Sequence, residues 1–115
     1  MDTTLTTKES YTTLSPKDFS EAIKSSNVYL LDVRNSDEFS GAHIPGAHNL
    51  NVMESDFLDK AQKLLPKDKI IAVYCLGGKR SAIAAETLAK AGYKIYNLEG
   101  GIENWQSQDL PVTSM

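Results

Sequence analysis

The chain has 115 residues, of which 41% are hydrophobic, 23% charged and 8% aromatic, as is typical of one soluble globular domain. A formal net charge of −3 argues against nucleic acid as the main partner, and no apolar run reaches the ~18–20 residues that a membrane-spanning helix requires. The single cysteine excludes an intramolecular disulfide, a Cys-x-x-Cys redox pair and a cysteine-rich zinc site.

The first thirteen residues are rich in threonine and lack the apolar segment of a secretory signal. We interpret 1–13 as a flexible polar end, with Tyr11 or Leu14 docking on the domain that residues 14–115 form. Without a secretory signal, the Cys75 thiol is expected in a reducing cytoplasm, and we predict a cytoplasmic protein.

Helical and extended patterns alternate along the first half of the domain. Ser15 and Pro16 are typical of the start of a helix, and the polar residues 25–27 indicate where that helix ends. An apolar run at 28–33 then predicts a buried strand. The pattern that follows predicts a short helix at 36–41, a turn at 44–47 and a short strand at 49–52. Apolar residues at helical spacing predict a helix over 54–65, which Pro66 ends.

The second half continues the alternation. The patterns predict a strand at 69–74 and an alanine-rich helix at 81–91. They then predict another strand at 93–98 and a final helix from Gly100-Gly101 through Trp105. Strands that alternate with helices at this spacing indicate a single α/β domain. We therefore expect a central, mainly parallel sheet with helices on both faces, over about residues 14–112.

Ligands of open α/β sheets bind beyond the carboxyl ends of the strands. One such end carries Cys75, followed by Gly77 and Gly78, whose freedom allows the backbone to curl until several N–H groups point inward. The positive end of the next helix faces the same point, and Lys79 and Arg80 add formal positive charge. Such surroundings favour a nucleophilic thiolate, so we interpret Cys75 as a reactive group rather than a buried small hydrophobe.

Other polar residues have plainer interpretations. Asp32, at the end of the first predicted buried strand, is interpreted as a structural residue that ties Arg34 or the cysteine loop in place. His43 is expected to form a hydrogen bond in a turn, because His43 and His48 have no partner cysteine for a metal site. Glu38 either pairs with a nearby base or faces water. We predict no metal and no cofactor.

The cysteine loop does not match the sequence motifs of nucleotide-binding or phosphate-binding sites. A phosphate-binding P-loop needs Gly at 73 and Ser or Thr at 80, where this chain has Val73 and Arg80, and no Gly-x-Gly-x-x-Gly occurs. Cysteine-based phosphatases place arginine six positions after the cysteine, whereas Arg80 follows Cys75 by five. The shorter loop encloses a ring of N–H groups better sized for one charged sulfur than for a phosphate.

Four motifs stand in order along nearly the whole chain: Asp-x-Arg at 32–34, Glu-Phe-Ser-Gly-Ala-His-Ile-Pro-Gly-Ala at 38–47, Cys-x-x-Gly-x-Arg at 75–80, and Leu-x-Gly-Gly-x-x-x-Trp at 98–105. Together they resemble the motifs of single-domain rhodaneses, a family of sulfurtransferases. The resemblance implies a rhodanese-like α/β fold.

The resemblance also implies a mechanism. The Cys75 thiolate would take the sulfane sulfur of thiosulfate or a persulfide, and the resulting persulfide would pass it to cyanide or a thiol with ping-pong kinetics. The backbone amides of the loop would stabilise the persulfide, and these belong to Leu76, Gly77, Gly78, Lys79 and Arg80.

Side chains also acquire roles by the resemblance. Arg80 would hold the donor or the loop, Lys79 would be a second cation at the rim, and Asp32 and Arg34 would brace the loop. With no second cysteine in the chain, the sulfur acceptor must be external, either a small molecule or a protein.

One departure concerns the donor. Many relatives that use thiosulfate carry arginine directly after the cysteine, where this chain has Leu76, and this favours a less charged donor such as a glutathione or protein persulfide. A sulfur carrier, or a non-catalytic docking module, is the alternative to an enzyme. A phosphatase or arsenate reductase is disfavoured by the loop length and the single cysteine.

Overall fold

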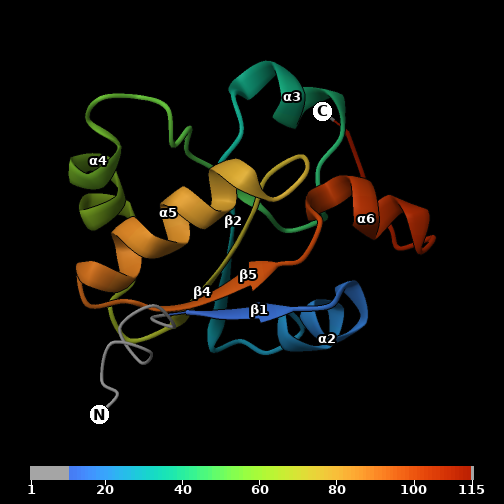
Figure 1. Cartoon of the computed structure of the whole chain (residues 1–115), viewed down its shortest axis with the longest axis horizontal. Helices are drawn as coiled ribbons and strands as arrows, with labels where there is room; N and C mark the ends of the chain where they lie inside the picture. The colour runs from blue at the N-terminus through green and yellow to red at the C-terminus, as the bar shows by residue number, and fades with distance from the viewer. Residues whose placement is uncertain (1–10, 115) are drawn as a thin grey trace, which may run out of the picture.

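The computed structural model describes residues 11–114. Five parallel strands form one sheet in the order β1-β5-β4-β2-β3. The strands are β1 (Thr12–Leu14), β2 (Val28–Asp32), β3 (His48–Asn49), β4 (Ile70–Tyr74) and β5 (Lys94–Leu98). The helices are α2 (Pro16–Ala22), α3 (Ser36–Gly41), α4 (Phe57–Leu64), α5 (Lys79–Lys90) and α6 (Gly101–Ser107). The predicted single α/β domain with a parallel sheet is confirmed (Figure 1).

Two hydrophobic cores lie on opposite faces of the sheet because successive strand side chains point in opposite directions. Ile71 and Val73 of β4 pack with α4 and α5, whereas Ala72 and Tyr74 pack with α2 and α6. Cys75 continues the first series and belongs to the α4/α5 face. The loop that follows it, between β4 and α5, lies between α3 and α6 (Figure 1).

The start of the domain differs from the prediction. Thr12 and Thr13 belong to β1, which pairs with β5 at the edge of the sheet, so the expected flexible end is wrong for these two residues. Both threonine side chains are exposed and the backbone of this segment pairs with β5, so these two positions leave no hydrophobic pattern to recognise. Tyr11 and Leu14 pack on the two cores, as expected. The remainder of the predicted flexible end, 1–10, lies outside the described residues.

Other boundaries shift by a few residues. The helix predicted over 54–65 begins at Phe57, and the strand predicted at 49–52 is β3, two residues long. The helix predicted from Ser81 begins at Lys79, because Gly78 takes a left-handed conformation (φ 113°) and caps it. The earlier start places Lys79 and Arg80 in the first turn of α5. Within residues 11–114, none of the helices has the length and apolarity to cross a membrane.

Candidate active site

Cys75 lies at the base of the loop between β4 and α5. It is 1% exposed, and its Sγ accepts a hydrogen bond of 3.1 Å from the backbone N–H of Gly78. The same loop forms an open pocket of about 270 Å³, lined by Cys75, Leu76, Gly77, Lys79 and Arg80. Cys75 is therefore almost fully covered and also lines a pocket that can admit a small donor.

The backbone amides of this loop are available to an anion. Across residues 11–114, no protein acceptor receives the N–H of Leu76, Gly77, Lys79 or Arg80. The amides of Lys79 and Arg80 belong to the first turn of α5, where helix N–H groups have no partner within the helix. Backbone amides without a protein acceptor can stabilise negative charge on a bound or developing anion.

The first turn of α6 holds the opposite side of the loop. Ile102 N–H donates to the Cys75 carbonyl at 2.9 Å, and Glu103 N–H donates to the Leu76 carbonyl at 3.1 Å. In a trans peptide the carbonyl and the next N–H point in opposite directions. The two contacts therefore turn the amides of Leu76 and Gly77 away from α6.

Gly101 makes this approach possible. It adopts φ +66°, and a Cβ atom here would overlap the Leu76 carbonyl and lie 2.6 Å from the Cys75 carbonyl oxygen. The sequence predicts a helix that starts at Gly100-Gly101 and includes both glycines in a family motif, but it does not predict this contact with the loop. The sequence signal for this contact is a pair of glycines directly after the strand that neighbours the cysteine strand in the sheet.

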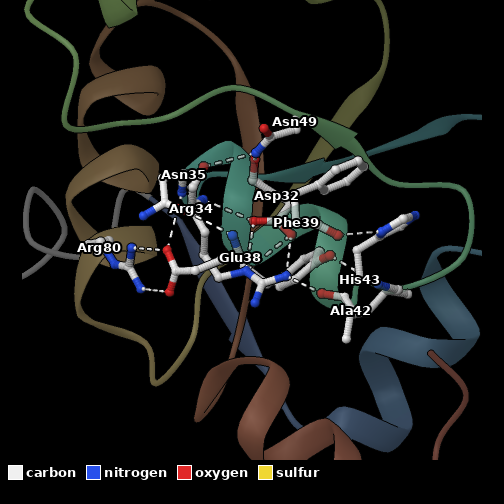
Figure 2. A network of polar contacts seen from close by, with 11 residues as sticks. Asp32, Arg34, Asn35, Glu38, Phe39, Ala42, His43, Asn49 and Arg80 are labelled. Atoms are coloured by element: carbon white, nitrogen blue, oxygen red, sulfur yellow. Dashed lines mark hydrogen bonds and ion pairs between the residues drawn. The ribbon is translucent and has the colours of Figure 1, made fainter. Parts of the chain in front are cut away.

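The guanidinium of Arg80 forms a two-pronged ion pair with Glu38 of α3 (Figure 2). The distances are 2.8 Å from Nη1 to Oε1 and 3.0 Å from Nη2 to Oε2, and the side chains are 27% and 26% exposed. The hydrogen bond from Arg80 holds the pKa of Glu38 below its usual value, and the same bond raises the pKa of Arg80. Of the two possibilities left open for Glu38, the structure shows pairing with a base, and that base belongs to the cysteine loop.

Glu38 is itself held in place by its helix. The side chain of Asn35 accepts the Glu38 N–H at 2.8 Å, and Glu38 Oε1 accepts the Asn35 N–H at 3.2 Å. This reciprocal capping box stabilises the start of α3. The carboxylate that receives Arg80 is therefore positioned by its own helix.

Asp32 ties Arg34, as expected. Both side chains are buried, and Arg34 Nη2 lies 2.7 Å from Asp32 Oδ2. Burial acts to lower the pKa of Arg34, but the hydrogen bond and charge of Asp32 outweigh it and raise that pKa overall. Arg34 also donates to the Ala42 carbonyl, and Asn49 donates to the carbonyls of Asp32 and Arg34 (Figure 2).

Bracing of the loop by this pair stays a prediction, and it does not take the form of a direct hydrogen bond. Among the described residues, neither Asp32 nor Arg34 forms a hydrogen bond with residues 76–80. The guanidinium of Arg34 lies 5.7 Å from the ring centre of Tyr74, whose side chain belongs to the α2/α6 face. Cys75 belongs to the core on the other face of the sheet, and the direct hydrogen bond that Arg34 forms outside the pair reaches the Ala42 carbonyl after α3.

His43 forms the predicted turn contact. Its Nδ1 lies 2.7 Å from the Phe39 carbonyl oxygen, and its ring stacks on the Phe39 ring at 3.9 Å. His48 stacks instead on Tyr29. In the part of the chain that the structure describes, no three His, Cys, Asp or Glu side chains converge in a way that could hold a metal ion.

Comparison with known proteins gives a consistent result. A family model described as the rhodanese-like domain matches residues 15–108. The thiosulfate sulfurtransferase GlpE of Coxiella burnetii is 33% identical over 89 residues, which are 76% of this chain and 79% of GlpE. The uncharacterized protein YqhL of Bacillus subtilis is 42% identical over 77 residues, 66% of this chain, but the match spans only 59% of YqhL. A crystal structure of a rhodanese-related protein from Thermoplasma volcanium superposes with a TM-score of 0.80 at 35% identity, covering 91% of this chain and 100% of that one.

Proposed function

Since the chain belongs to the rhodanese-like domain family, we propose that it is a sulfurtransferase that uses Cys75 as its nucleophile. It takes a sulfane sulfur from thiosulfate or a persulfide and passes it to a thiol or cyanide. The observation that carries the proposal is the setting of Cys75: the residue lines a pocket, its Sγ receives the Gly78 N–H, and the neighbouring loop amides have no protein acceptor among residues 11–114. The similarity to GlpE supports thiosulfate as one donor.

The first half-reaction transfers one sulfur atom. The Cys75 thiolate attacks the outer sulfur of the donor, a new S–S bond forms, and the donor's own S–S bond breaks. The electron pair of that bond leaves with sulfite when the donor is thiosulfate, or with a thiolate when the donor is a persulfide. Cys75 is left as a persulfide whose terminal sulfur is anionic once any proton has passed to the leaving thiolate.

The loop stabilises this charge electrostatically. Gly78 N–H already donates to Sγ, and the amides of Leu76, Gly77, Lys79 and Arg80 are available to the added sulfur. Because α6 holds the peptide planes that carry the Leu76 and Gly77 amides, these two amides need little reorganisation as the charge arrives.

The second half-reaction needs an external nucleophile. Cys75 is the only cysteine, so no resolving thiol exists within the chain. Cyanide or a thiol attacks the terminal sulfur, the S–S bond breaks, and its electron pair returns to the Cys75 thiolate. Donor and acceptor therefore bind in turn, which gives ping-pong kinetics. We place this chemistry in the cytoplasm, where a free thiol stays reduced.

Intact-protein mass spectrometry tests the proposal. The wild-type protein and the Cys75→Ala variant are treated separately with thiosulfate and glutathione persulfide. We expect the wild type alone to gain one sulfur atom, and cyanide to remove it. No gain from either donor would refute the enzyme and would favour a non-catalytic docking module.

A sulfur carrier would give a different kinetic pattern. It would load Cys75 but would pass sulfur slowly to cyanide and small thiols. Rapid loading followed by turnover with a small acceptor therefore supports the enzyme over the carrier.

A further inference from the structure

The charges beside the pocket balance one another. Lys79 and Arg80 line it, but the guanidinium of Arg80 is already paired with Glu38. A second carboxylate stands on the α6 side, where Glu103 Oε1 lies 3.6 Å from the position that a Cβ atom on Gly77 would occupy. The loop that looks cationic in sequence is therefore bordered by two cations and two anions.

Glu103 is held at this position by its own backbone. Its N–H donates to the Leu76 carbonyl at 3.1 Å, so the residue that carries the carboxylate is joined to the pocket wall. The side chain is exposed and can meet an incoming molecule. Lys79, also exposed, follows the same loop at the start of α5.

We propose that Glu103 is a specificity-determining residue of the proposed sulfur transfer, and that the donor it selects is a zwitterionic persulfide of an amino acid or small peptide. The inference rests on the proposed function and names its donor. The ammonium group of such a donor is attracted by Glu103, and its carboxylate by Lys79. Thiosulfate carries two negative charges and no ammonium group, so the Glu103 carboxylate repels it.

The apolar side chain of Leu76 also favours this class of donor. Its side chain is 39% exposed at the pocket, where it offers an apolar contact to the carbon atoms of an organic persulfide. Thiosulfate has no such atoms. Charge and apolar contact therefore favour the same donor class.

The chemical step is unchanged by this choice. The Cys75 thiolate attacks the outer sulfur of R–S–SH, the R–S bond to that sulfur breaks, and the thiolate R–S⁻ leaves with the electron pair. The proton of the outer sulfur passes to R–S⁻, so that the products are the Cys75 persulfide anion and R–SH. No oxidant or reductant takes part.

The test compares donors in the Glu103→Gln variant. Steady-state transfer to cyanide is measured at low ionic strength with thiosulfate and with cysteine persulfide, and glutathione persulfide is measured as a peptide donor. We expect kcat/KM to rise about three- to tenfold for thiosulfate and to fall several-fold for cysteine persulfide. Added salt should shrink both changes, because it screens charges at the surface.

A matched control separates selectivity from stability. Glu103 lies in the first turn of α6, where a carboxylate also favours the helix, and loss of that effect changes stability but not the preference between donors. Glu86→Gln removes another exposed carboxylate, one that pairs with Lys90 on α5, and should leave the ratio of the two kcat/KM values unchanged. The Lys79→Gln variant should lower kcat/KM for both donors.

The outcomes distinguish this inference from the proposed function. If wild-type Cys75 gains sulfur but Glu103→Gln leaves the donor ratio as it was, the role of Glu103 is refuted and the sulfurtransferase stands. If wild-type Cys75 gains sulfur from none of the three donors, the proposed function fails and this inference falls with it. A donor ratio that shifts toward thiosulfate in Glu103→Gln, by an amount that added salt reduces, supports the inference.

Discussion

The contact between α6 and the cysteine loop can be tested by replacing Gly101 with alanine. The added Cβ would overlap the Leu76 carbonyl and crowd the Cys75 carbonyl, and both are backbone atoms that cannot swing aside. A left-handed φ of +66° costs a residue with a Cβ about 1–2 kcal/mol. The overlap also displaces α6 and breaks its hydrogen bonds to the two carbonyls, each of which contributes about 0.5–1.5 kcal/mol.

Together these effects lower the free energy of unfolding by about 2–5 kcal/mol. A domain of this size has about 5–15 kcal/mol in total, so Gly101→Ala is expected to fold with a clear loss of stability. Urea denaturation at constant m-value measures the loss. Sulfur gain at Cys75 should also slow by more than about tenfold in the folded variant, because the loop amides lose their orientation.

Two glycines provide matched controls. Gly46 also has a positive φ, of +89°, but a Cβ there meets nothing within 4 Å, so Gly46→Ala should lose only the conformational part, about 1–2 kcal/mol. Gly41 has neither a positive φ nor a near neighbour for a Cβ, so Gly41→Ala should be neutral or stabilising by up to about 1 kcal/mol. A Gly101→Ala loss no larger than that of Gly46→Ala, with sulfur gain unchanged, would refute the role assigned to the α6 contact.

Three further substitutions follow from the site. Glu38→Gln removes the ion pair with Arg80 and should lower the free energy of unfolding by about 1 kcal/mol at pH 7, since the pair is partly exposed. The pKa of Glu38 in the folded protein lies below the ordinary 4.5. The stability that the pair contributes is therefore complete above pH 4.5 and disappears as the pH falls through the folded pKa. Urea denaturation of the wild type and the variant at decreasing pH should show the difference between them vanish in acid. Arg34→Leu leaves the buried Asp32 carboxylate without its partner and should cost about 3–5 kcal/mol by the same assay; a loss below 1 kcal/mol would contradict the buried pair. Leu76→Arg should raise kcat/KM for thiosulfate several-fold in the cyanide assay with little change in stability, because Leu76 is partly exposed, and an unchanged value would remove the argument from its apolar character.

The helices and strands can be predicted from sequence wherever burial produces a run or a regular spacing of apolar residues. β2, β4 and β5 are apolar runs between turns, and α5 has alanine on its buried face, so each was recognised close to its true bounds. β1 left no such pattern, because its threonines are exposed and its pairing with β5 is a backbone interaction. An edge strand of this kind becomes visible only when its partner is known.

The absence of a direct hydrogen bond from Asp32 or Arg34 to the loop has a simple geometric cause. The family resemblance implies that the two residues brace the loop, and Asp32 is in register with Tyr74, the residue before Cys75. Successive side chains alternate between faces, however, and Asp32 shares the face of Leu30 while Cys75 shares the face of Val73. Counting the alternation along both strands predicts that the Asp32 side chain and the Cys75 sulfur start from opposite faces of the sheet.

The same reasoning explains why the loop needs supports from elsewhere. Gly77 and Gly78 give the backbone the freedom to curl, but that freedom also allows the amides to turn away from the sulfur. Three separate elements restrict it: β4 holds the Cys75 end, Glu38 of α3 holds Arg80, and the amides of α6 hold the carbonyls of Cys75 and Leu76. Stabilisation of a persulfide by backbone amides depends on their being oriented before the charge arrives. The two motifs far from the cysteine in sequence, around Glu38 and at Gly100-Gly101, therefore act on the same loop and explain why a six-residue segment alone is not a sufficient description of the site.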